Sequence, residues 1–217
     1  MKPKFIIIEG GEGAGKGTAI AIAKALLGES MVFTREPGGS PLAEKIRTLS
    51  LDTEEGKQAN AKTQFGLVWA ARADHMKNTV IPALKAGKHV VCDRFDSSTW
   101  TYQICGQEDS ELKALFFDTR RVYLGEHAPD LYIYLDVDPV IGLQRRNAAG
   151  DLNHFDTKPL DFHQRVRAGY QEFMTRVPSV TIDASQSMAD VEQEFRRVLT
   201  QFIEGSLIVE TPAIRNN

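Results

Sequence analysis

A glycine-rich loop that directly follows an apolar run is the feature that most constrains the fold of this chain. Residues 5–8 are apolar, and a helix-like stretch begins after residue 18. Small residues in such a loop let successive backbone N–H groups surround a phosphate chain, and the N-terminus of the following helix adds positive potential. We therefore predict a phosphate-binding P-loop rather than a plain glycine-rich turn, formed by Gly10, Gly11, Glu12, Gly13, Ala14, Gly15, Lys16, Gly17 and Thr18.

Position 17 departs from the usual pattern of this loop. The residue after the lysine is commonly a Ser or Thr whose hydroxyl binds Mg²⁺, whereas here it is Gly17. Lys16 still supplies a mobile cation for the outer phosphates, and Thr18 can offer its hydroxyl to an α-phosphate. The loop is therefore expected to keep its phosphate cradle and to contact a metal less directly.

Apolar runs alternate with helical segments along the rest of the chain. Helices are expected over 18–27, from Pro41 with Ser40 as its N-cap, and over 63–86 with a bend at Pro82. Strict alternation of this kind implies a parallel sheet with helices on both faces, and ligands that bind at the carboxyl ends of the strands. We predict an α/β protein with a five-stranded P-loop NTPase-type sheet, its strands at 5–9, 31–34, 89–93, 131–137 and 180–182.

Length and charge bound the domain organisation and the partners. The 217 residues suffice for one substantial core, so we predict a single domain over 1–204 and a possibly disordered tail over 205–217. Lys and Arg number 26 against 29 Asp and Glu, and the net charge of -3 gives no electrostatic case for nucleic-acid binding. With no apolar leader or membrane-length run, and only Cys92 and Cys105 as packing thiols, we expect a cytoplasmic protein without membrane contact.

Two polar clusters follow predicted strands. The segment from Asp93 to Gln103 begins where the strand over 89–93 ends, so Asp93 should face the P-loop. A carboxylate there can hold Mg²⁺ through water, and Arg94 can neutralise phosphate charge. A solvated loop with a local Asp to Arg pair is the alternative. The second cluster is the turn Thr34-Arg35-Glu36-Pro37-Gly38-Gly39-Ser40, which can bring backbone close to a ligand.

These clusters, taken together, resemble the thymidylate kinase family of nucleoside monophosphate kinases, particularly its bacterial branch. The P-loop with its acid Glu12, the turn over 34–40, Trp69-Ala70-Ala71-Arg72, the segment over 93–103 and Leu135-Asp136-Val137 occur in the order of that family, and the resemblance extends over about residues 4–204. It implies transfer of the γ-phosphoryl group of ATP to dTMP with Mg²⁺, and a homodimer.

The resemblance also assigns roles to individual residues. Catalysis would fall to Lys16, Asp93, Arg94 and the lid residues Arg145 and Arg146, with Asp93 reaching the metal through water. Glu12 would lie near the 3′ hydroxyl of the acceptor, and Tyr102 and Tyr170 would border its deoxyribose. The full set implied for the acceptor site is Glu12, Glu36, Pro37, Arg47, Val68, Arg72, Arg94, Ser98, Thr99, Tyr102, Gln103 and Tyr170.

Two further departures bear on activity and selectivity. In the lid, about residues 145–159, Asn147, Ala149 and His154 stand where bacterial relatives carry further basic residues, and Arg145 and Arg146 could equally just finish a helix. Val68 occupies a position where relatives commonly place a Phe that stacks on thymine. Base recognition could shift to Trp69 or Phe65, or selectivity could loosen toward dUMP.

Three functions remain open at the level of sequence. The first is a dTMP kinase, and the second, suggested by Gly17 and Val68, is a P-loop kinase for another nucleoside monophosphate. The third, suggested by the thinned lid, is a catalytically degenerate nucleotide-binding protein. All three share the P-loop.

Overall fold

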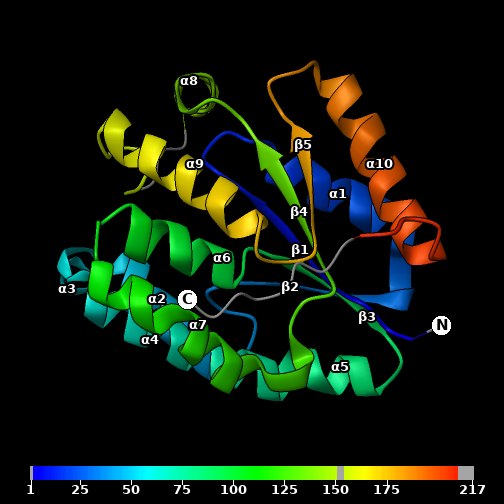
Figure 1. Cartoon of the computed structure of the whole chain (residues 1–217), viewed down its shortest axis with the longest axis horizontal. Helices are drawn as coiled ribbons and strands as arrows, with labels where there is room; N and C mark the ends of the chain where they lie inside the picture. The colour runs from blue at the N-terminus through cyan, green and yellow to red at the C-terminus, as the bar shows by residue number, and fades with distance from the viewer. Residues whose placement is uncertain (1, 151–153, 210–217) are drawn as a thin grey trace.

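Five parallel strands form one central sheet in the computed structural model, which describes residues 2–150 and 154–209. The spatial order is β2-β3-β1-β4-β5, so the first strand lies in the middle. It is buried along its whole length, and its first four residues, 5–8, are all apolar. Figure 1 shows the strands fanning through the centre of the molecule. Their bounds are β1 Phe5–Gly10, β2 Met31–Arg35, β3 His89–Asp93, β4 Leu131–Asp136 and β5 Ser179–Asp183.

The register brings the polar clusters to one edge of the sheet. Asp93, at the end of β3, pairs with Ile8 of β1 and with Arg35 of β2. On the other side of β1, Gly10 pairs with Leu135 near the end of β4. The P-loop, the turn after β2 and the segment after β3 therefore begin side by side, as parallel strand order requires.

Helices cover both faces of the sheet (Figure 1). Side chains alternate along β1, so Phe5 and Ile7 face one apolar core while Ile6 and Ile8 face the other. The larger core lies under α4, α7 and α9, and the smaller one under α1 and α10. The helices are α1 Lys16–Leu27, α2 Pro41–Asp52, α3 Glu54–Gln58, α4 Ala61–His75, α5 Ile81–Lys85, α6 Asp96–Ser98, α7 Ser110–Leu124, α8 Pro139–Ala149, α9 Leu160–Met174 and α10 Met188–Glu204.

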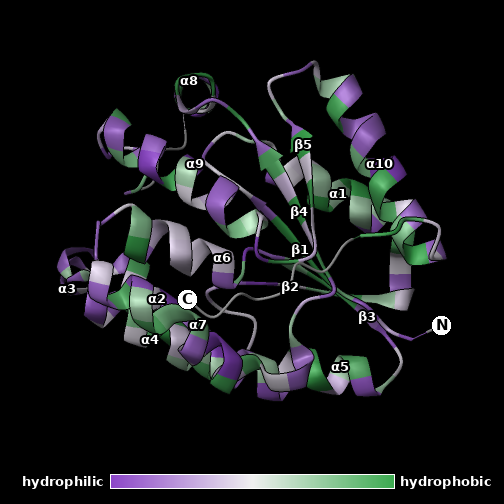
Figure 2. Ribbon diagram, viewed as in Figure 1, coloured by the Kyte–Doolittle hydropathy of each residue, from purple (hydrophilic) through white to green (hydrophobic). Residues whose placement is uncertain are grey.

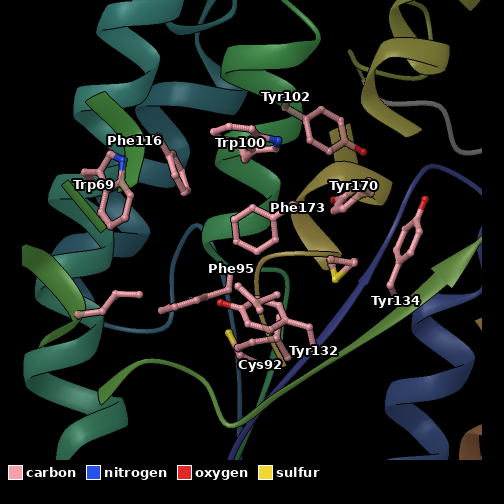
Figure 3. Close-up of a cluster of buried hydrophobic side chains, with 14 of the residues drawn as sticks. Trp69, Cys92, Phe95, Trp100, Tyr102, Phe116, Tyr132, Tyr134, Tyr170 and Phe173 are labelled. Atoms are coloured by element: carbon pink, nitrogen blue, oxygen red, sulfur yellow. The ribbon is translucent and has the colours of Figure 1, made fainter. Parts of the chain in front are cut away.

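Aromatic rings fill the larger core. Phe116 of α7 lies between Trp69 and Trp100, with ring centroids 5.7 Å and 5.2 Å away (Figure 3). Figure 2 shows the complementary pattern, with apolar strands at the centre and polar residues on the outer faces of the helices. Burial of these large rings is the main apolar contribution to the stability of this half of the molecule.

Two π-helical segments interrupt the helical regions. The first, Met76–Val80, joins α4 to α5 just before Pro82, whose ring cannot continue a regular helix. The second, Thr99–Cys105, continues α6 and carries several predicted site residues. π-helical turns of this kind are frequent at functional sites because they re-aim side chains.

The structure confirms the α/β class, the five strands and the division of the helix over 63–86 at Pro82. Ser40 does precede α2, but its oxygen accepts no hydrogen bond from the first turn of the helix, and its hydroxyl donates to Asp74 of α4 at 2.6 Å. Within the predicted tail, Leu207 and Val209 pack against the core under α1 and α10. Residues 210–217 lie outside the described residues.

A buried ion pair fixes the start of α6 against α7. The carboxylate of Asp96 is fully buried and accepts from Arg120 Nε at 2.6 Å and from the Tyr132 hydroxyl at 2.6 Å. Asp96 begins the segment over 96–105, so this ion pair holds in place the segment that carries Ser98, Thr99 and Tyr102. Arg121, the next residue, forms only an exposed pair with Asp118.

Arg120→Leu should lower the free energy of unfolding by about 3–5 kcal/mol, because it leaves the Asp96 carboxylate buried without its cation. Urea denaturation followed by circular dichroism measures this change. Arg121→Leu is the matched control and should cost less than about 1 kcal/mol, as exposed pairs do. Equal losses of unfolding free energy in the two variants would show that the buried pair contributes no more to stability than the exposed one.

Candidate active site

The P-loop holds its lysine in a defined place. Lys16 Nζ donates to the carbonyl oxygens of Gly10 and Gly11 at 2.8 Å and 3.0 Å. Burial and the neighbouring charge of Arg94 lower the pKa of Lys16 to about 8, although Glu12 acts in the opposite direction. The lysine thus lies among backbone oxygens beside a second cation, ready to exchange those contacts for phosphate oxygens.

Two glycines let the P-loop touch α8 backbone to backbone. A Cβ on Gly13 would lie 2.1 Å from the carbonyl oxygen of Gly142, and a Cβ on Gly142 would lie 2.2 Å from that of Glu12. Gly13 also has a φ of 69°, a conformation that favours glycine. The predicted need for small residues in this loop therefore has a concrete cause at position 13.

A pocket of about 970 Å³ opens over the P-loop. Residues from Glu12 to Thr18 line it, together with Asp93, Arg94, Arg145 and Arg146. Gly10 and Gly11 lie beneath, where their carbonyls accept from Lys16. We call this space the donor pocket, since it holds the loop and cations suited to a triphosphate.

A second pocket, of about 350 Å³, lies on the other side of Arg94. We call it the acceptor pocket. It is lined by eleven of the twelve side chains implied for the acceptor site, namely Glu12, Glu36, Pro37, Arg47, Val68, Arg72, Arg94, Ser98, Thr99, Tyr102 and Gln103. The twelfth, Tyr170, is fully buried behind them. Glu12, Asp93 and Arg94 line both pockets, so the two spaces meet at these side chains.

Arg94 is the hub where the pockets meet. Its guanidinium donates to Glu12 Oε1 at 3.3 Å and to the hydroxyls of Tyr102 and Tyr170 at 3.3 Å each. Its backbone has a φ of 64°, an uncommon value for a residue with a side chain. Burial would raise the pKa of Glu12, but the charges of Arg94 and Lys16 outweigh it and lower that pKa.

A buried carboxylate behind Arg94 organises the hub. Glu9, at the end of β1, is fully buried and accepts from the Phe95 N–H at 2.8 Å and the Ser97 hydroxyl at 2.6 Å. Ser98 and Tyr170 also donate to it, at 3.0 Å and 2.8 Å. Burial raises the pKa of Glu9, while the charge of Arg94 lowers it in part. Tyr170 therefore supports Arg94 from beneath the pocket surface in this conformation.

The turn after β2 is tied to α4 by a second buried network. Glu36 accepts from Arg72 Nε at 2.8 Å, and its other oxygen lies 2.9 Å from His75 Nδ1. Arg72 also donates to the Thr99 hydroxyl at 3.0 Å. The remaining guanidinium nitrogen, Nη1, is buried and has no hydrogen-bond partner among the described residues. It is a donor at the wall of the acceptor pocket that suits a carbonyl oxygen of a ligand.

Arg47 and Pro37 form the rim of this pocket. The peptide bond between Glu36 and Pro37 is cis, and Arg47 Nη1 donates to the Pro37 carbonyl oxygen at 2.8 Å. Arg47 is thus held by the turn while it lines the pocket. The expectation that the turn brings backbone and charge to a ligand site is consistent with this position.

The two arginines of the predicted lid lie near the end of α8 and line the donor pocket. Arg145 Nη1 donates to the carbonyl oxygen of Ala184 at 2.8 Å, and Arg146 pairs with Asp156 at 3.0 Å. Both arginines do lie at the end of a helix, which was the alternative to a role in the lid. They also line the donor pocket. Residues 151–153 of the predicted lid lie outside the described residues.

Asp93 is the carboxylate best placed for a metal. Its Oδ1 is buried without a hydrogen-bond partner among the described residues, and its side chain lines both pockets. The described residues contain no group of three or more His, Cys, Asp or Glu that could hold a metal ion. A single carboxylate next to a phosphate site fits Mg²⁺, which keeps several waters and shares phosphate oxygens.

Sequence reasoning missed several residues that shape the site. Glu9 and His75 looked like parts of a strand and a helix, and nothing in their local pattern signals their buried partners. Trp69 and Phe65, offered as substitutes for an aromatic at position 68, are buried and do not line the acceptor pocket. The lid residues His154 and Phe155 do line it. The one sequence signal for Phe155 was that it is an aromatic residue inside the predicted lid.

Comparisons with known proteins agree with one another. A family model described as thymidylate kinase matches residues 8–195. The thymidylate kinase of Pseudoalteromonas translucida (strain TAC 125) is 40% identical over 206 residues, which cover 93% of this chain and 98% of that one. The crystal structure of thymidylate kinase from Ehrlichia chaffeensis has a TM-score of 0.72 at 26% identity, covering 92% of this chain and 99% of that one.

The lowered pKa of Lys16 predicts that ATP binding weakens above about pH 8. Below that pH the free protein already carries the charged lysine, whereas above it binding must take up a proton, so the Kd should rise up to about tenfold per pH unit. Isothermal titration calorimetry between pH 7.5 and 9.5, in buffers of different ionisation enthalpy, measures both effects. Lys16→Arg, which stays charged, should show a flat profile. A flat profile for the unaltered protein as well would refute the lowered pKa.

Proposed function

The chain belongs to the thymidylate kinase family, and from this membership and the paired pockets we infer that it transfers the γ-phosphoryl group of ATP to dTMP, giving dTDP and ADP. The observation that carries this inference is the junction of the pockets. Glu12, Asp93 and Arg94 line both, so a donor on the P-loop and an acceptor on the other side would meet at one point. Other acceptors and a loss of catalysis, the two alternatives open from sequence, find no support in the comparisons.

The reaction asks the protein mainly for positioning and cations. An oxygen of the acceptor phosphate attacks the γ-phosphorus, the bond to the β,γ-bridging oxygen breaks, and ADP leaves. Charge spreads over the transferred group, so preorganised cations are the chief source of stabilisation. We assign Lys16, which lines the donor pocket, to the donor phosphates. We assign Arg94, which lines both pockets, to the acceptor phosphate. Arg145 and Arg146 would stabilise the donor side from α8.

The acceptor would be held by groups that already have fixed positions. Arg72, with Nη1 unpartnered among the described residues, would donate to a carbonyl oxygen at the edge of thymine, beside Ser98, Thr99 and Gln103. Arg47, with Glu36 and Pro37 at the rim, would support the phosphate. Glu12 would accept from the 3′ hydroxyl, and Tyr102, backed by Tyr170, would lie against the deoxyribose, where a ring leaves little space for a 2′ hydroxyl. Val68 would contact the base.

Mg²⁺ fits the residues present, with Asp93 as the protein group that would hold it through water. When bound, the ion neutralises phosphate charge and orients the donor phosphates. Gly17 contributes no hydroxyl, and Thr18 is the hydroxyl-bearing residue of the loop that lines the donor pocket. The chain therefore relies on Lys16 and its arginines for charge that other P-loops share with a directly bound metal.

A homodimer is proposed through α4 and α7, which run side by side along one outer edge of the molecule (Figure 1). Leu115, Val122 and Tyr123 of α7 are exposed apolar residues, and Gly66 and Ala70 are exposed on α4. Such a face can be covered by a second copy.

A cytoplasmic location is proposed as well and fits the two free cysteines. No helix among the described residues is long and apolar enough to cross a bilayer.

A coupled ADP-release assay with ATP and Mg²⁺ tests the function against dTMP, dUMP, dGMP, dAMP, dCMP and AMP in parallel. We expect dTMP to be preferred. Weaker turnover of dUMP should accompany it, because Val68 offers no aromatic face to distinguish the bases and one methyl group is worth only about 0.8 kcal/mol, or roughly fourfold.

Lys16→Ala should lower turnover by at least about a hundredfold in the same assay, because it removes a cation from the transferred group. Lys24→Ala, on the far part of α1, is the control and should leave turnover unchanged. Unimpaired turnover of Lys16→Ala would refute the assigned mechanism, and turnover of dTMP alone would remove the proposed leniency toward dUMP.

A further inference from the structure

The acceptor pocket lacks an aromatic face where its wall comes from α4. Val68 presents an aliphatic side chain there. Trp69 is 2% exposed, and its ring packs against Phe116 and Tyr123, away from the pocket. Phe65 is 7% exposed and packs on Trp69. Neither ring can reach a base without unpacking the core.

Phe95 lines the pocket but is covered. Its side chain is fully buried, and the Arg72 guanidinium lies 4.9 Å from the centroid of its ring. The same guanidinium lies 4.4 Å from the ring of Trp69. Arg72 is therefore held between two rings, whose faces it occupies. An incoming base meets the guanidinium rather than Phe95.

Phe155 lies in the segment between α8 and α9 and carries a further aromatic ring of this pocket. It lines the acceptor pocket and is only partly buried. Its ring stands edge-on to Tyr102, with centroids 5.0 Å apart and an angle of 71° between the rings. Phe162 lies nearly parallel to it at 6.4 Å. These two neighbours fix the orientation of the Phe155 ring beside the Tyr102 that is bonded to Glu12.

We propose that Phe155 is a further acceptor-binding residue whose ring packs on the base of the acceptor, in place of the aromatic side chain that Val68 does not supply. This proposal rests on the proposed function and adds a residue to its acceptor site. Aromatic rings stack on any nucleobase because every base has a π-face. The ring therefore increases affinity for the acceptor without choosing between thymine and uracil. Recognition of the base edge stays with Arg72, which would donate to a carbonyl oxygen of the base.

The next residue links this ring to the donor side. Asp156 pairs with Arg146, which lines the donor pocket. One short segment therefore reaches the acceptor through Phe155 and the donor through the partner of Asp156. Loss of the Phe155 ring alone should spare the ATP side, because the pair of Arg146 and Asp156 is left in place.

Steady-state kinetics of Phe155→Ala with dTMP and ATP test the proposal. The KM for dTMP should rise about 5- to 150-fold, the range expected for loss of one stack on a base, while the KM for ATP stays within about twofold. Phe155→Trp should keep the KM of the unaltered protein, and Phe155→Leu should behave like Phe155→Ala. Leu160→Ala, an exposed position at the start of α9, is the control and should change neither KM.

Two further measurements separate stacking from a general disturbance of the segment. Binding of 2-deoxyribose 5-phosphate, which has no base, should be equally weak in Phe155→Ala and the unaltered protein. Adding Val68→Phe to Phe155→Ala should restore much of the affinity for dTMP, since it returns a ring to the other wall. An unchanged KM for dTMP in Phe155→Ala, equal rises for dTMP and ATP, or equal losses for the baseless compound would each overturn the proposal. Absence of ADP release by the unaltered protein would instead refute the proposed function.

Discussion

The buried carboxylate of Glu9 is the interaction on which the arrangement of the site depends. It lies at the end of the central strand and accepts hydrogen bonds from Phe95, Ser97, Ser98 and Tyr170. Removing a charge from water is costly, so such a group needs its full set of donors. Those donors come from the segment after β3 and from α9, and their convergence fixes both elements on β1. Arg94 lies inside this frame and is hydrogen-bonded to Tyr102, Tyr170 and Glu12.

Charge in the site is balanced locally between unlike neighbours. Arg94 and Lys16 lie close together and repel each other electrostatically. Glu12 forms an ion pair with Arg94, and its negative charge also favours the charged form of Lys16. Phosphate oxygens can replace the backbone oxygens that Lys16 now contacts and can bind Arg94 beside Glu12. A polyanion is therefore the ligand for which this geometry is preorganised, and the tyrosines around Arg94 limit how far it can turn away.

The sheet and the P-loop were predictable from the sequence because they depend on local patterns, whereas the residues expected at the acceptor site came from the resemblance to a family. The unbroken apolar run of β1 and the glycines after it identify a central strand and a P-loop without any distant contact. The support of the site was not predictable in this way. Tyr170 reaches Glu9 across 161 positions, and His75 reaches Glu36 across 39. Such pairs follow from packing in three dimensions, which periodicity does not encode. Phe155 was missed for the same reason.

The contact between Gly13 and Gly142 has a mechanical consequence. Because there is no side chain between the two backbones, there is no soft layer to absorb a displacement. A displacement of the P-loop backbone at Gly13 would therefore press directly on the backbone of α8 at Gly142. Arg145 and Arg146 are one turn further along α8. Phosphate binding at the P-loop would in this way be coupled to the positions of Arg145 and Arg146 through backbone contact alone. A chain with few lid cations could then place those cations when nucleotide binds.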